Sequence, residues 1–164
     1  MTKNSSTSEG LAGLILRVNG AIQSIAGPSL TQFILRIALA TPFWRSGVRK
    51  WDGFLQLNDT ATYLFAHELK LHLPGGPYDF PAPSITAFLS GSGEIIFPIL
   101  LLIGFATRFA ALGLLAMTII IQLTVPTGWP VHITWAAMAM AIMAWGPGKI
   151  SIDQIFRTKF AQEH

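Results

Sequence analysis

The chain has 164 residues, enough for one domain, and carries a net charge of +3 with a pI near 9.6. Charged residues make up only 12% of it and hydrophobic residues 51%, whereas a typical soluble domain is about 25% charged. Without cysteine the chain cannot itself form disulfides, iron–sulfur clusters or CxxC redox pairs, and its scattered basic residues argue against nucleic-acid binding.

The first 27 residues are expected to be a disordered tail followed by an amphipathic surface helix. Residues 1–10 are polar, and from residue 11 to 26 apolar side chains recur at helical spacing on one face. Arg17, Asn19 and Gln23 fall mostly elsewhere on that helix. The pattern predicts a helix lying on a membrane surface; a helix packed on the end of a bundle is the alternative.

Four apolar segments follow, and we predict that each spans a membrane: residues 30–46, 84–105, 109–125 and 131–145. Between residues 84 and 147 the only acidic or basic side chains, histidine aside, are Glu94 and Arg108. The first segment is the least apolar, because it contains Arg36 and Pro42. The predicted fold is therefore all-α, a four-helix transmembrane bundle in residues 28–150.

A long polar segment, residues 48–83, separates the first two predicted spans. Asn58 or Asp59 can cap a short helix running through TATYLFAHELKLH, and LPGGPYDFPAP after it is predicted to be a loop. Small residues at positions 90–93 are expected to let helix backbones approach closely. Residues 151–164 are predicted to be a cytoplasmic amphipathic tail.

The short connections between the later spans predict antiparallel neighbours, and an even number of spans places both termini on one side of the membrane. That side would carry six basic residues, a modest excess: Lys3, Arg17, Arg108, Lys149, Arg157 and Lys159. The other side would carry Arg45, Arg49, Lys50 and Lys70, accompanied by four acidic residues. The positive-inside rule therefore favours cytoplasmic termini.

Arg36 and Glu94 are the two ionisable residues that lie most clearly inside predicted spans. A charge at mid-bilayer costs about 2.5–3.5 kcal/mol, so such groups are expected to be paired or to face a wet cavity. Counted from the predicted cytoplasmic ends, they lie about 9 and 15 Å deep. We predict an intramembrane Arg36–Glu94 pair, which either fixes helix register or borders a cavity for a polar or quinone-like ligand.

Histidines and a glutamate near the other face form the only candidate metal set, although we expect no metal. His67 and His72 are five residues apart and do not form an HExxH motif. Glu68 and His72 are four apart, share a helix face, and could bind zinc or copper together with His132. A hydrogen-bonded cap at the membrane boundary is the alternative.

Five stretches, taken in order, resemble the DoxX family of small bacterial membrane proteins. They are RIALATPFWRSGVRK (residues 36–50), ATYLFAHEL (61–69), GEIIFPILLLIGFATRFAAL (93–112), WPVHITWA (129–136) and GPGKISID (146–153). The resemblance covers roughly residues 33–155, and Lys50 falls in the GxxK motif of the family pattern. Lys50 and three residues expected near the same face of the membrane form a candidate ligand pocket: Lys50, Glu68, Trp129 and His132.

The resemblance implies a four-helix fold in the bacterial inner membrane and association with membrane oxidoreductase systems, including thiosulfate-to-quinone oxidation and superoxide detoxification. We expect an accessory or anchor subunit of a redox or metal-stress system rather than a stand-alone enzyme. Its expected contacts are the lipid bilayer, a protein partner and a quinone, and a homo-oligomer is a further option. The alternatives are a subunit that itself passes electrons to quinone, for which the chain has no flavin motif, and a small transporter or assembly chaperone.

Overall fold

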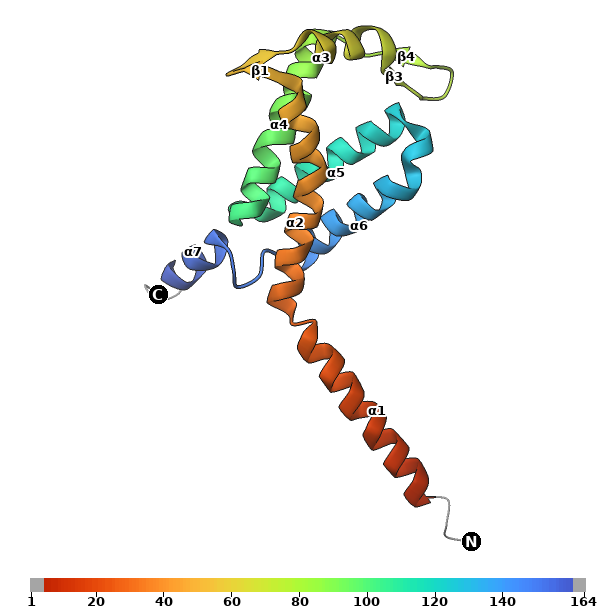
Figure 1. Ribbon diagram of the computed structural model, residues 1–164, viewed down its shortest axis with the longest axis vertical. Coiled ribbons are helices and arrows are strands. Elements are labelled where there is room, and N and C mark those ends of the chain that lie inside the picture. Colours follow the sequence, from red (N-terminus) through yellow and green to blue (C-terminus); the bar gives the residue numbers. More distant parts are fainter. Residues whose placement is uncertain (1–4, 161–164) are drawn as a thin grey trace.

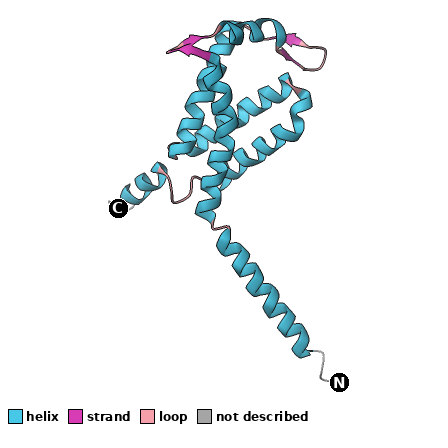
Figure 2. Cartoon of the chain, viewed as in Figure 1, coloured by secondary structure: helices cyan, strands magenta, loops and turns pink. Residues whose placement is uncertain are grey.

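The computed structural model describes residues 5–160, and this part of the chain is mostly helical (Figures 1 and 2). Its α-helices are α1 (Ser5–Ile25), α2 (Pro28–Gly47), α3 (Asp59–Tyr63), α4 (Pro83–Ile103), α5 (Thr107–Thr124), α6 (Trp129–Trp145) and α7 (Ile152–Phe160). Two short antiparallel hairpins pair β1 (Trp51–Gly53) with β2 (Gln56–Leu57) and β3 (Lys70–Leu71) with β4 (Tyr78–Asp79). Figure 2 places all four strands at one end of the molecule.

Helices α2, α4, α5 and α6 coincide with the four predicted spans. Helix α2 starts at Pro28, where the missing N–H of proline has no intrahelical partner to lose. Helix α4 ends at Gly104, whose φ of 71° is the left-handed conformation that glycine adopts most easily. By length and composition, α4 and α5 are the two described helices that are long and apolar enough to cross a membrane.

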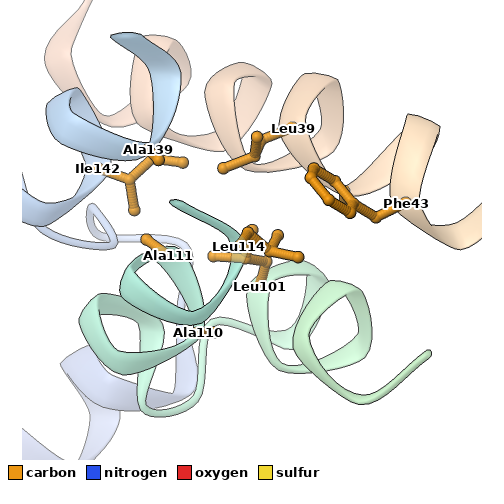
Figure 3. Packing of buried hydrophobic residues seen from close by; sticks show 9 residues of the cluster. Leu39, Phe43, Leu101, Ala110, Ala111, Leu114, Ala139 and Ile142 are labelled. Atoms are coloured by element: carbon orange, nitrogen blue, oxygen red, sulfur yellow. The ribbon is translucent and has the colours of Figure 1, made fainter. Parts of the chain in front are cut away.

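The core lies where α2, α4, α5 and α6 meet (Figure 3). Its buried side chains are Leu39, Ala40 and Phe43 of α2, Leu101 of α4, Ala110, Ala111 and Leu114 of α5, and Ala139 and Ile142 of α6. Alanines on α5 and α6 let these two helices pack closely as an antiparallel pair. Figure 3 shows leucine and phenylalanine side chains of α2 directed toward this pair and α4.

Large apolar side chains are exposed on the outward faces of α4 and α5. In the most hydrophobic stretches of α4 and α5 only 28% of the residues are buried, whereas a core helix of a soluble protein is mostly buried. Leu89 is 64% exposed and Phe109 is 77% exposed. A continuous apolar outer surface on helices with satisfied backbones is the surface expected to face lipid.

Helix α1 extends away from the other helices (Figure 1). It starts at Ser5, so the expected disordered tail is wrong for residues 5–10, and residues 1–4 lie outside the described part of the chain. Leu11, Leu14 and Leu16 are 61%, 59% and 71% exposed. The alternative that this helix packs on the end of the bundle is therefore not found.

The long polar segment contains a shorter helix than predicted. The side-chain oxygen of Asn58 accepts a hydrogen bond from the Ala61 N–H at 2.7 Å and caps α3. A π-helical turn continues α3 to Glu68, after which the chain becomes extended. The two hairpins of this segment were not predicted, because four strands of two or three residues are too short to show an alternating pattern.

A small apolar cluster fastens the polar segment to α4. Phe65 and Phe80 pack edge-to-face, with ring centroids 5.3 Å apart, and both contact Ala87 of α4. The segment therefore covers the end of α4 rather than extending away from it, as Figure 1 shows.

The C-terminal segment is attached near the end of α4 that lies away from the polar segment (Figure 1). The carboxylate of Asp153 accepts hydrogen bonds from the Ala106 N–H at 2.8 Å, the Thr107 N–H at 3.0 Å and the Thr107 hydroxyl at 2.7 Å. It thus caps the N-terminus of α5, where backbone N–H groups have no helical partner. Helix α7 begins at this attachment, and residues 161–164 of the predicted tail lie outside the described residues.

Candidate functional site

Two close contacts fix how the antiparallel helices α2 and α4 lie against each other. A Cβ atom placed on Gly47 would lie only 2.9 Å from the backbone carbon of Glu94, so these two residues are level with each other. At the other end, Gly104 packs directly on the guanidinium of Arg36. Arg36 precedes Gly47 by eleven residues, so Arg36 and Glu94 lie about 16 Å apart along the helix axis.

The predicted Arg36–Glu94 ion pair is therefore not formed. The Nη2 of Arg36 donates a hydrogen bond to the carbonyl oxygen of Ile150 at 2.8 Å, while the Glu94 carboxylate pairs with Lys50. The prediction placed the two side chains about 6 Å apart in depth, because it took the spans to begin and end at one common level. Both side chains are nevertheless buried, Arg36 with 1% and Glu94 with 3% exposure.

Lys50 reaches Glu94 because the chain turns over α4 immediately after α2 ends. A 3-10 turn, Val48–Lys50, follows Gly47 and directs the lysine side chain back toward the helices. Its Nζ contacts the Glu94 Oε2 and donates a further hydrogen bond to the Ser46 hydroxyl at 2.9 Å. The pair neutralises a carboxylate that would otherwise be an isolated charge between two helices.

A cavity of about 930 Å³ lies beside this ion pair. Polar side chains from the end of α2, the polar segment and α4 line one part of it: Ser46, Arg49, Lys50, Asn58 and Glu94. The remaining lining is mostly apolar and includes Phe43, Phe65, Phe97, Met117, Ile121 and Trp135. Its volume lies within the range of small-molecule pockets, and the combination of a charged group with a long apolar wall suits an amphiphile.

Of the four residues in the predicted ligand pocket, only Lys50 lines this cavity. Glu68 and Trp129 have exposed side chains, and neither faces the cavity. His132 is buried elsewhere: its Nδ1 lies 2.8 Å from the Gln122 Oε1, and its ring centroid lies 5.2 Å from that of Trp135. The end of α3 and the start of α6 therefore do not converge on one site with Lys50.

The candidate metal ligands Glu68, His72 and His132 are not brought together either. The helix ends at Glu68, so Glu68 and His72 do not share a helix face as the spacing predicted. The Nδ1 of His72 lies 3.1 Å from the carbonyl oxygen of Leu123. Across residues 5–160, no three histidine or carboxylate side chains are gathered closely enough to hold a metal ion.

Sequence reasoning did not find Ser46 and Asn58 as parts of the site. Ser46 shares the Lys50 ammonium with Glu94, and the Asn58 side chain donates to the Arg49 carbonyl at 2.7 Å, which fixes the turn that carries Lys50. The GxxK motif from Gly47 to Lys50 was the available signal. It combines a residue that lets α4 approach with a cation one turn further along the chain.

Comparison with known proteins agrees with the apolar character of the helices. The chain is 24% identical over 143 residues to an uncharacterized protein of Haemophilus influenzae, a match that covers 80% of this chain and 86% of that relative. No solved structure matches. The DoxX family model matches residues 31–127, which include most of α2, the polar segment, α4 and α5. Since this match takes in more than half of the chain, the protein belongs to the DoxX family of membrane proteins.

Proposed function

We propose that the protein is a multi-pass subunit of the bacterial inner membrane in which α2, α4, α5 and α6 all cross the bilayer. The exposed apolar faces of α4 and α5 support this proposal, since these side chains would be costly in water. The buried core that joins all four helices supports it too, because α2 and α6 pack alongside α4 and α5. Both termini then lie in the cytoplasm, and the polar segment with its two hairpins lies outside.

Within this subunit, the cavity beside Lys50 and Glu94 would bind an amphiphilic, quinone-like molecule. A quinone has carbonyl oxygens that accept hydrogen bonds and an isoprenoid chain that is fully apolar. The Lys50 ammonium and the exposed Arg49 guanidinium supply donors at the polar end of the cavity. Phe97, Met117 and Trp135 supply an apolar wall for the ring and chain.

The role that fits this site is that of an accessory or anchor subunit in a redox or metal-stress system. The chain would hold a membrane-soluble redox molecule, or a lipid of similar shape, next to a protein partner that carries out the electron transfer. The single observation that carries the proposal is the 930 Å³ cavity with one ion pair in an otherwise largely apolar lining.

Calorimetric titration of a short-chain benzoquinone into the full-length protein in mild detergent tests the ligand. The double variant Lys50→Met/Glu94→Gln removes both charges while preserving side-chain size. We expect saturable binding to the wild-type protein and an affinity about tenfold weaker for the variant, the amount that a hydrogen bond to a charged group contributes.

The matched control is Lys70→Met/Asp79→Asn, which removes the ion pair between β3 and β4 outside the cavity. Its affinity should equal that of the wild type. Absence of saturable binding to the wild-type protein, or equal affinity in the Lys50/Glu94 variant, would contradict a quinone site at this pair.

A further inference from the structure

Arg36 is a fully buried cation whose hydrogen-bonding capacity is mostly unused. One of its nitrogens, Nη2, donates to the carbonyl oxygen of Ile150 at 2.8 Å. The other two, Nε and Nη1, are buried and have no hydrogen-bond partner among residues 5–160. A guanidinium is always charged and carries five N–H donors, so most buried arginines are paired with an anion.

No carboxylate among the described residues forms a direct ion pair with Arg36. Asp153 attracts the guanidinium electrostatically, but its hydrogen bonds go to the N-terminus of α5 through Ala106 and Thr107. Glu94 lies at the far end of α4 in its pair with Lys50. The ring of Phe33, 5.4 Å from the guanidinium carbon, stabilises the cation but accepts no conventional hydrogen bond.

A second, shallower cavity of about 330 Å³, largely open to the surface, borders this guanidinium and also reaches Lys149. Its remaining lining is mostly apolar and includes Phe33, Leu102, Ile103 and Ile155. Leu102, Ile103 and Ile155 are also exposed on the outer surface, so the apolar lining continues out of the cavity. Two cations beside an apolar path match a ligand that has an anionic head and a hydrocarbon stem.

We propose that this cavity binds the phosphate of an anionic phospholipid, with Arg36 at its inner end and Lys149 at its mouth. The planar fork of a guanidinium matches two phosphate oxygens, and a lysine supplies a second positive charge. The inference rests on the proposed membrane placement, in which Gly104, where α4 ends, marks the cytoplasmic boundary of the bilayer. Because Arg36 packs against Gly104, the cavity would then lie at the level of the lipid headgroups.

These two cavities would therefore take different ligands. In the 930 Å³ cavity Glu94 neutralises Lys50, so the buried polar end carries no net charge and Arg49 is an exposed cation of the lining; this favours an uncharged acceptor such as a quinone carbonyl. In the smaller cavity Arg36 and Lys149 form no ion pair with a carboxylate in the described chain, which favours an anion.

Native mass spectrometry of the full-length protein in zwitterionic detergent tests the proposal. Short-chain phosphatidylglycerol, short-chain phosphatidylcholine and inorganic phosphate are each titrated into the wild type and into Arg36→Gln, Arg36→Lys and Lys149→Gln. We expect the wild type to prefer phosphatidylglycerol over phosphatidylcholine about tenfold, and Arg36→Gln and Lys149→Gln to lose most of this preference. Arg36→Lys, which keeps the charge but not the fork, should show an intermediate value.

The matched control is Arg108→Gln, which removes a basic residue at the same end of the molecule but outside the cavity. It should keep the wild-type preference. Benzoquinone binding at the other cavity should be unchanged in the Arg36 and Lys149 variants, so its loss would identify a variant that has not folded. If Arg36→Gln does not fold, the lipid preference of Lys149→Gln tests the proposal instead, because replacing the exposed Lys149 should not prevent folding.

Two results would overturn the proposal. One is a wild-type protein with no lipid preference, or a preference that survives in folded Lys149→Gln and Arg36 variants. The other is binding of inorganic phosphate as tight as that of phosphatidylglycerol, which would make the site one for a soluble anion. Either result leaves the quinone proposal standing, because that proposal depends on a different cavity.

Discussion

Glu94 is almost completely shielded from solvent, with its backbone against Gly47 of α2 and its carboxylate paired with Lys50. Lys50, with 17% of its side chain exposed, is the charge that balances it. Pairing does not make a buried ion pair strongly stabilising overall, because removing both charges from water is costly. The pair makes the effect of each residue on the free energy of unfolding depend on whether the other residue is present, and this coupling energy can be measured.

A double-mutant cycle on Glu94→Gln and Lys50→Met measures that dependence. Each single change leaves one buried polar or charged group without its partner, so each should lower the free energy of unfolding by about 3 kcal/mol. The double variant should lose less than the sum of the two, by more than about 1 kcal/mol. Denaturation in mixed SDS micelles, followed by circular dichroism, gives the values.

The exposed pair Lys70–Asp79 provides the comparison cycle, with Lys70→Met and Asp79→Asn. Because both groups remain in contact with solvent, its coupling energy should be below about 1 kcal/mol. Additive losses at Lys50 and Glu94 would show that the two side chains do not form the buried pair.

The sequence predicted that Glu94 needs a cation beside it, but it did not predict that this cation is Lys50. A glutamate in an apolar segment requires a cation, and that requirement was clear from composition alone. The partner depends on helix register, which sequence periodicity does not give, and on the turn after Gly47, which carries Lys50 over α4. The cavity itself is built from α2, α4, α5, α6 and the polar segment, so no local pattern reports it.

Among the elements, the pairing of α2 with α4 determines the geometry of both cavities. The two helices meet most closely at Gly47, where any side chain would collide with the backbone of Glu94. Small residues at such crossings let helix backbones come together in membranes as they do in water. The same register aligns Lys50 with Glu94 at one end and Arg36 with Gly104 at the other.

Gly47→Ala tests this packing directly. The added Cβ would lie 2.9 Å from backbone atoms of Glu94 that cannot move without separating α2 from α4. We expect a loss of about 1–3 kcal/mol in the free energy of unfolding, measured as above. Gly13→Ala in α1 is the matched control, since nothing lies within 4 Å of its new methyl group and the better helix propensity should stabilise α1. Equal stability of the two variants would contradict a close crossing at Gly47.

The small residues at positions 90–93 illustrate what periodicity can and cannot predict about elements. They do allow close approach, but to side chains: Trp51 packs on Gly91, and the Met117 sulfur lies 3.1 Å from a Cβ placed on Gly93. The long helices were predictable because their apolar runs are bounded by glycine and proline. The short helix and hairpins of the polar segment depend on tertiary contacts such as Phe65 with Phe80, and they were predicted only in part.

At the level of the whole molecule, the two ends of the packed helices differ. One end carries the polar segment and the other carries the attached C-terminal segment (Figure 1). The Lys50–Glu94 pair and the larger cavity border the polar segment, which contributes Lys50 and Asn58 to the lining, and the smaller cavity beside Arg36 is lined partly by Ile152 and Ile155 of α7. Helix α1 is outside the packed helices, and its exposed leucines fit the amphipathic surface helix that we propose. All of these assignments depend on four helices crossing the bilayer with both termini on the cytoplasmic side.

Single-cysteine labelling tests that claim most directly, because the chain contains no cysteine of its own. Ser24→Cys, Gln56→Cys, Thr127→Cys and Thr158→Cys place one thiol in α1, β2, the α5–α6 connection and α7 respectively. In intact bacterial spheroplasts a membrane-impermeant maleimide should label positions 56 and 127, and it should reach positions 24 and 158 only after the membrane is permeabilised. Labelling of positions 24 and 56 from the same side would contradict the four-span account.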